Sequence, residues 1–226
     1  MSRNINWHIL FPKQTTISQP QLTAIRHLLA NTGFRFINPH NGQIMLINGG
    51  GMGLIPVPDE ASAFQFISTH STSLVTLWKE DTDISLEFDP LGANFVELAS
   101  TYGWDDDSLY GSISLSINHT YLRKSNQMAW IVGNIHQLFG QLCNCMSSPF
   151  GFALDEWSLE CYTNTWHIQK DVAAHLLPSI LFPVGYYRAG YFPDFSTSMF
   201  ERLGYKCDSV DSVGHIISNL DELLTE

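Results

Sequence analysis

Three groups of residues in this sequence have types that could perform chemistry. The first is the glycine-rich run Gly49-Gly50-Gly51-Met52-Gly53. Such a loop cradles phosphate when a helix begins directly behind it, but Leu54-Ile55-Pro56-Val57-Pro58 cannot begin a helix promptly. The run also lacks the dinucleotide-binding spacing, and no Gly-Lys-Ser/Thr follows it. We therefore interpret these glycines as turn residues.

The second group is acidic and consists of Asp105, Asp106 and Asp107. Calcium takes oxygen ligands, but adjacent carboxylates point apart, and the alternating spacing of a calcium-binding loop is missing. The simpler interpretation is an exposed acidic loop. Together with the acidic residues at 80, 81 and 83, this loop would instead form an acidic face that meets a basic partner.

The third group comprises nine histidines and four cysteines. No two histidines have the spacing of a zinc motif, and Cys143, Cys145, Cys161 and Cys207 form no Cys-x-x-Cys pair. Nucleophilic catalysis would require a Gly-x-Ser-x-Gly elbow, or a cysteine in a recognisable context with a histidine partner. The sequence offers neither, so it predicts no metal, no cofactor and no specific catalytic residue.

An aromatic segment, Tyr186-Tyr187-Arg188-Ala189-Gly190-Tyr191-Phe192, is the remaining candidate. Tyrosine and arginine are enriched among the anchors of protein interfaces. The alternative is that these rings pack on the core. The candidate partner-binding residues are therefore Asp105, Asp106, Asp107, Tyr186, Tyr187 and Tyr191.

Two helices are indicated by the spacing of apolar residues. Ser18 and Gln21 form a capping box before an apolar stripe that ends at Gly33. A second stripe predicts a helix over about 125–145, in which two glycines indicate close packing on another element.

The strands are indicated by alternation. Residues 5–11, 74–78, 84–88 and 113–117 alternate apolar and polar side chains, and residues 157–166 also fit a strand. Asn41-Gly42 between two apolar runs predicts a β-hairpin, as does the polar loop at 79–83. Because such short loops join antiparallel strands, the sequence predicts an α+β fold: a mainly antiparallel sheet packed against two principal helices. We expect a single domain over 1–226; the alternative has two lobes with a break near 100–125.

Composition narrows the function classes. The 226 residues are 44% hydrophobic and only 15% charged, with a net charge of −11. This balance argues against disorder, against nucleic-acid binding and against an anionic membrane surface, and it suits a basic protein partner. The amino terminus lacks a secretory signal and the cysteines fit reduced thiols, so we expect a cytoplasmic protein. Self-association into a homo-oligomer stays open.

One stretch resembles a known group of proteins. The strand Ile113-Ser114-Leu115-Ser116-Ile117 and the helix ending near Cys145 precede Pro149-Phe150-Gly151-Phe152-Ala153-Leu154-Asp155-Glu156. This order resembles bacterial immunity proteins of polymorphic-toxin systems, and Leu181-Phe182-Pro183 before the aromatic segment is similar. The resemblance implies a protein that binds and blocks a cognate toxin. No diagnostic motif carries over any toxin-contacting residue.

The function hypotheses therefore come from three classes. The first is a non-enzymatic binding protein that neutralises a cognate toxin. The second is a small hydrolase or transferase whose site assembles from scattered His and Asp/Glu residues. The third is a self-associating structural protein that uses the aromatic segment. A cleft with converging histidine and carboxylate groups would favour the enzyme.

Overall fold

The described strands belong to one ten-stranded sheet in which every pairing is antiparallel. The computed structural model describes residues 4–14, 17–48, 54–69, 73–79, 82–89, 109–118, 131–155 and 167–220. In spatial order the strands are β3 (Leu54–Val57), β2 (Ile44–Asn48), β4 (Ser73–Lys79), β5 (Thr82–Asp89), β6 (Tyr110–Asn118), β1 (Asn4–Pro12), β7 (Phe150–Asp155), β8 (Val184–Arg188), β10 (Gly214–Ser218) and β9 (Lys206–Val210).

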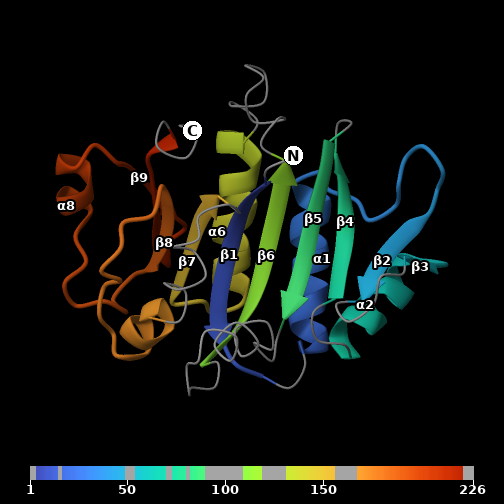
Figure 1. Cartoon of the computed structure of the whole chain (residues 1–226), viewed down its shortest axis with the longest axis horizontal. Helices are drawn as coiled ribbons and strands as arrows, with labels where there is room; N and C mark the ends of the chain where they lie inside the picture. Colours follow the sequence, from blue (N-terminus) through green and yellow to red (C-terminus); the bar gives the residue numbers. More distant parts are fainter. Residues whose placement is uncertain are drawn as a thin grey trace.

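Helices α1 (Gln19–Asn31) and α6 (His136–Cys145) lie side by side on one face of the sheet (Figure 1). Helix α2 (Glu60–Thr69) lies next to β2, β3 and β4, while α8 (Thr197–Arg202) precedes β9. A further helix spans residues 167–173. The predicted α+β fold, with a mainly antiparallel sheet packed against two principal helices, is confirmed.

Helix α1 begins and ends where local sequence signals place its boundaries. The Ser18 backbone N–H donates to Gln21 Oε1 at 3.0 Å, and Ser18 Oγ accepts from the Gln21 backbone N–H at 3.5 Å. This reciprocal capping box satisfies two groups that a helix start would leave unpaired. The chain leaves the helix through Gly33, whose φ of +80° is one that glycine adopts without strain.

The described part of the second principal helix opens with an irregular turn. Residues Ile131–Ile135 form a π-helical turn that runs directly into α6. The apolar stripe then buries Ile135, Leu138, Phe139 and Leu142 against the sheet. The predicted segment before residue 131 lies outside the described residues.

One sequence prediction about the strands needs correction. The prediction of a β-hairpin at Asn41-Gly42 is wrong. The Asn38 backbone N–H donates to the Gln43 carbonyl at 2.9 Å and so closes a compact loop. Strand β2, which follows this loop, pairs with β3 and β4. The segment just before this loop, residues 34–37, does not form a strand; within it, only Arg35 makes an isolated β-bridge. By contrast, the hairpin of β4 and β5 is confirmed.

The sequence directly after α6 contributes a central strand. Strand β7 occupies 150–155, inside the stretch that carried the resemblance, and pairs with the central strand β1. The strand predicted over 157–166 lies outside the described residues.

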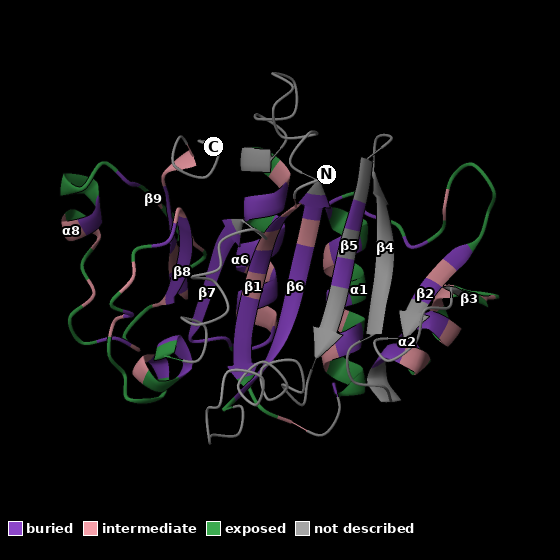
Figure 2. Cartoon of the chain, in the orientation of Figure 1, coloured by how far each residue is buried: buried purple, intermediate pink, exposed green. Residues whose placement is uncertain are grey.

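Both faces of the central strands are buried, so the sheet has two cores (Figure 2). One core lies under α1 and α6 and takes alternate residues of β1, namely Ile5, Trp7, Ile9 and Phe11. The other contains Leu10, Phe150 and Tyr187. Ser112 and Ser114, polar residues that alternate with the apolar residues of β6, are only 8% and 9% exposed.

Two further properties of the described residues bear on function. No described helix combines the length and the apolar run that crossing a bilayer requires. Within the same residues, no group of three or more His, Cys, Asp or Glu could hold a metal ion. Cys143, Cys145 and Cys207 carry free thiols.

Candidate functional site

The candidate site lies where α6 meets the hairpin of β9 and β10. His136, Gly140 and Cys143 follow one buried flank of α6, next to its apolar stripe. A Cβ atom on Gly140 would lie 2.8 Å from Val210 Cγ2 and 2.9 Å from Ile216 Cδ1. The hairpin can therefore approach the helix only because residue 140 has no side chain.

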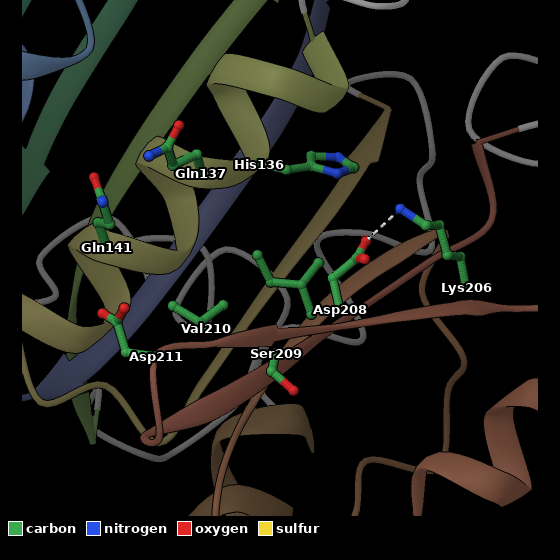
Figure 3. Close-up of a pocket in the computed structure, with 9 residues that line it drawn as sticks. His136, Gln137, Gln141, Lys206, Asp208, Ser209, Val210 and Asp211 are labelled. Atoms are coloured by element: carbon green, nitrogen blue, oxygen red, sulfur yellow. Dashed lines mark ion pairs between the residues drawn. The ribbon is translucent and has the colours of Figure 1, made fainter.

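Strand alternation decides which hairpin side chains face the helix. Successive residues of a strand point to opposite faces, so Lys206, Asp208 and Val210 turn toward α6, whereas Ser209 points away (Figure 3). On the opposite face, Cys207 contacts the second core, and its thiol donates to the Thr197 carbonyl at 3.7 Å.

Helix and hairpin together enclose a hollow of about 370 Å³. At roughly 30 Å³ for each water in the liquid, this volume is large enough for about a dozen waters or for one extended side chain. The lining residues are His136, Gln137, Gln141, Lys206, Asp208, Ser209, Val210, Asp211 and Ile216.

Two buried polar atoms on α6 have no hydrogen-bond partner among the described residues. They are His136 Nε2 and Gln141 Oε1, and both residues line the hollow. His136 is only 6% exposed, and its imidazole extends from α6 toward Asp208 and Lys206 (Figure 3). Because a buried polar atom without a partner costs about 1–3 kcal/mol, the pair marks a place where a ligand group would be stabilising.

The electrostatics of the hollow are set by burial and by one ion pair. Burial lowers the pKa of His136 to about 4, with Asp208 opposing and Lys206 assisting that shift. The imidazole is therefore neutral at pH 7. Lys206 Nζ lies 2.9 Å from Asp208 Oδ2, and both side chains are exposed, by 65% and 49%. Such an exposed pair contributes little to stability and is readily rearranged.

A second, more open hollow of about 570 Å³ lies beside the first. It shares Gln141 and Asp211 with the first hollow and extends to α1, where Gln21, Ala24 and Leu28 contribute to its lining. The two hollows form one recessed surface over α1, α6 and the turn between β9 and β10. We call this surface the α6 groove.

The tyrosines proposed from the sequence lie elsewhere and are largely internal. Tyr186 and Tyr187 are 0% and 1% exposed and belong to the two opposite cores. Tyr191 is partly exposed, donates its hydroxyl hydrogen to the Val172 carbonyl at 3.1 Å and stacks on His175. A side chain packed in the core offers no surface to a partner, so of the three only Tyr191 is placed to touch one.

Asp105, Asp106 and Asp107 lie outside the described residues. Their proposed role in meeting a partner stays a prediction.

The α6 groove brings a histidine and carboxylates together, which is the arrangement that would favour an enzyme. A pKa near 4 makes His136 a weak base at neutral pH, since general bases work best with a pKa near the working pH. The Ser209 side chain points away from α6, and burial raises the pKa of the Cys143 thiol well above its ordinary value. The described lining thus offers hydrogen-bond acceptors rather than an activated nucleophile.

Sequence reasoning did not find this groove. Residue spacing did not single out His136, Gln141, Lys206, Asp208 or Asp211; the histidines entered only together, as metal ligands or as members of a scattered enzyme site. One available signal was the set of polar residues around Gly140 within an otherwise apolar helix. Nothing in the linear spacing joins that helix to the β9–β10 hairpin.

Comparison with solved structures finds a similar fold. The solved structure "Pseudomonas aeruginosa T6SS protein PA0821" superimposes with a TM-score of 0.50 and 9% sequence identity. The match covers 96% of this chain and 65% of that chain, so this chain spans less than two thirds of the other protein's length. No protein-family model matches the chain, and no curated protein matches its sequence. At this identity the likeness is one of fold.

Proposed function

We propose that this chain is a non-enzymatic protein of a bacterial toxin system that binds a basic cognate toxin in the cytoplasm and neutralises it. The observation that carries the proposal is the α6 groove. It is a recessed surface with unpaired hydrogen-bond acceptors, and its described lining holds two carboxylates and one ammonium group. A surface of this kind is suited to receiving donor groups from another protein.

The fold comparison supports the same setting. PA0821 is described as a T6SS protein, and its fold is similar to that of this chain over 96% of the chain. A context of secreted toxins agrees with the sequence resemblance to immunity proteins, which came from different information. The two lines together favour toxin neutralisation over an unspecified binding role.

Overall charge supports a basic partner. The chain carries 22 acidic and 11 basic residues. Long-range attraction between oppositely charged proteins accelerates their encounter by orders of magnitude. An immunity protein benefits from such speed, because it must reach the toxin before the toxin reaches its target.

A hydrolase or transferase is the second candidate, favoured by the proximity of His136 and Asp208. The two candidates differ in what His136 does. In an enzyme His136 would move a proton, and His136→Gln would abolish turnover. In a binding protein the same change would alter affinity by the loss of one contact.

Co-expression tests the proposed function. Toxin domains encoded beside the gene would be expressed in bacteria with and without this chain, and survival would be counted. We expect survival to be restored by the chain, and the purified pair to form a stoichiometric complex in gel filtration. Failure to protect against every neighbouring toxin, or protection without a complex, would contradict the proposal.

A folding control belongs in the same experiment. Ile135 is 1% exposed in the core beneath α6, and Ile135→Asp would bury an unpaired charge. This variant should unfold and lose protection. The exposed change Thr23→Ala on α1 should leave protection intact.

A further inference from the structure

We propose that the hollow between α6 and β9 binds the guanidinium group of an arginine side chain that the partner inserts. This inference rests on the proposed function, because it names the partner group that enters the groove. It starts from the set of polar atoms that line the hollow.

Two residues that line the hollow carry buried polar atoms that are acceptors or can act as acceptors. Gln141 Oε1 is a carbonyl oxygen, and no described residue donates to it. A neutral imidazole has one nitrogen with a free lone pair, and Nε2 is that nitrogen when the proton is on Nδ1. His136 Nε2 is likewise without a partner among the described residues.

Carboxylates supply the charge. Asp208 comes from β9 and Asp211 from the turn that follows, so they approach the hollow from the side opposite α6 (Figure 3). A donor group in the hollow would therefore meet the neutral His136 imidazole on the α6 side and negative charge on the hairpin side (Figure 3). A ligand with several N–H donors and one positive charge fits this distribution.

A guanidinium group fits this distribution of acceptors and charge better than an ammonium group does. It is planar, carries five N–H donors in a fixed arrangement and is more weakly hydrated than an ammonium group, so it is easier to bring into a half-buried site. Val210 and Ile216 add apolar wall at the hairpin, against which the methylene stem of arginine can pack.

Lys206 is the competitor for the same charge. Its ammonium group already pairs with Asp208 at 2.9 Å, and its side chain is 65% exposed. An entering guanidinium would have to share or displace this pairing. Removing Lys206 should consequently strengthen binding, whereas neutralising Asp208 should weaken it. Affinity changes of opposite sign at these two paired residues would not result from a simple loss of structure.

The test is an NMR titration of the full chain with Nα-acetyl-arginine methylamide. Saturable shifts should appear at the His136 ring, assigned through His136→Gln, and at the Gln141 side-chain amide. The citrulline analogue has the same shape without the charge and should bind at least tenfold more weakly, because hydrogen bonds to charged groups contribute about 1.5–3 kcal/mol. The lysine analogue should also bind more weakly.

Variants locate the binding. Asp208→Asn should lower the affinity for the arginine probe about tenfold, and Lys206→Met should raise it. Asp194 is exposed and does not line the hollow, so Asp194→Asn is the matched control and should change nothing. Urea unfolding of each variant checks that the fold is retained.

Equal binding of the arginine and citrulline probes, equal binding of the lysine probe, or shifts away from the hollow would overturn the inference. The titration contains no toxin, so its failure would leave neutralisation by another surface standing. If the chain binds the arginine probe but does not protect in co-expression, the proposed function is contradicted, whereas the proposed arginine site stands.

Discussion

His136 is an ionisable side chain in surroundings that disfavour its charged form. Its pKa falls from 6.5 to about 4 on folding because burial penalises the imidazolium ion. Between these two pH values the unfolded chain binds more protons than the folded chain, so the free energy of unfolding decreases as the pH falls. At pH 7 both states are mostly neutral and the effect is absent.

We predict that acidification from pH 7 to pH 5 destabilises the protein through this residue by about 2 kcal/mol. Urea unfolding of the wild type and of His136→Gln at both pH values measures the contribution as a difference of differences. Any loss of packing against Trp7 is present at both pH values and cancels.

The control is Thr23→Ala, an exposed and non-titrating change on α1 that should keep the pH dependence of the wild type. If His136→Gln loses stability between pH 7 and pH 5 as steeply as the wild type does, then His136 is not the group responsible.

At the scale of elements, the packing of α6 depends on a residue that weakens the helix. Glycine in a helix interior costs up to about 1 kcal/mol relative to alanine, yet Gly140 lies at the closest approach of α6 to the hairpin. A Cβ atom there would lie 2.8 Å from Val210 Cγ2, and valine has little rotamer freedom with which to yield. The sequence predicted close packing at both glycines of this helix. The structure confirms it at Gly140, but at Gly133 an added Cβ would meet no described atom within 4 Å, so the prediction is wrong there.

We predict that Gly140→Ala destabilises the fold by about 1 kcal/mol and Gly140→Val by more, because overpacking of about 1–3 kcal/mol outweighs the gain in helix propensity. Gly133 is the matched control, since no described atom lies within 4 Å of a Cβ at that position. Gly133→Ala should be neutral or stabilising. Thermal unfolding of the three variants decides, and a stabilised Gly140→Ala would show that the hairpin can move away at no cost.

At the scale of the whole molecule, charge should govern how fast a partner is met. Exposed charges separated by more than roughly 8 Å are largely screened at physiological ionic strength. With a net charge of −11, association with a basic toxin should therefore slow markedly as salt is added. The dissociation rate should depend much less on salt, because it reflects buried contacts.

We predict that replacing Asp105, Asp106 and Asp107 together with Asn lowers the association rate and leaves the free energy of unfolding nearly unchanged. Stopped-flow mixing at low and high salt measures the rates. Wild-type association by this variant at low salt would mean that the acidic run takes no part in the encounter.

Much of the local structure was predictable because its causes are local. The capping box at Ser18, the apolar stripe through Ile135 and the alternation of Ile113, Leu115 and Ile117 are set by residues a few positions apart. Antiparallel pairing followed from short connections. These features determine the fold class without knowledge of the strand order.

The tertiary structure alone decided which faces are covered and which distant residues meet. β1 lies between β6 and β7, and the face of β6 that carries the polar residues Ser112 and Ser114 is buried as well. Tyr187 is internal because it lies in the second core.

The α6 groove shows most directly what residue spacing cannot predict. His136 meets Asp208 only because the sheet continues from β1 through β7, β8 and β10 to β9, which carries the last hairpin under α6. Periodicity reports how a segment presents its own side chains, whereas a site between distant segments depends on the order in which strands pair. That order is set by long-range packing, which residue spacing along the chain does not encode.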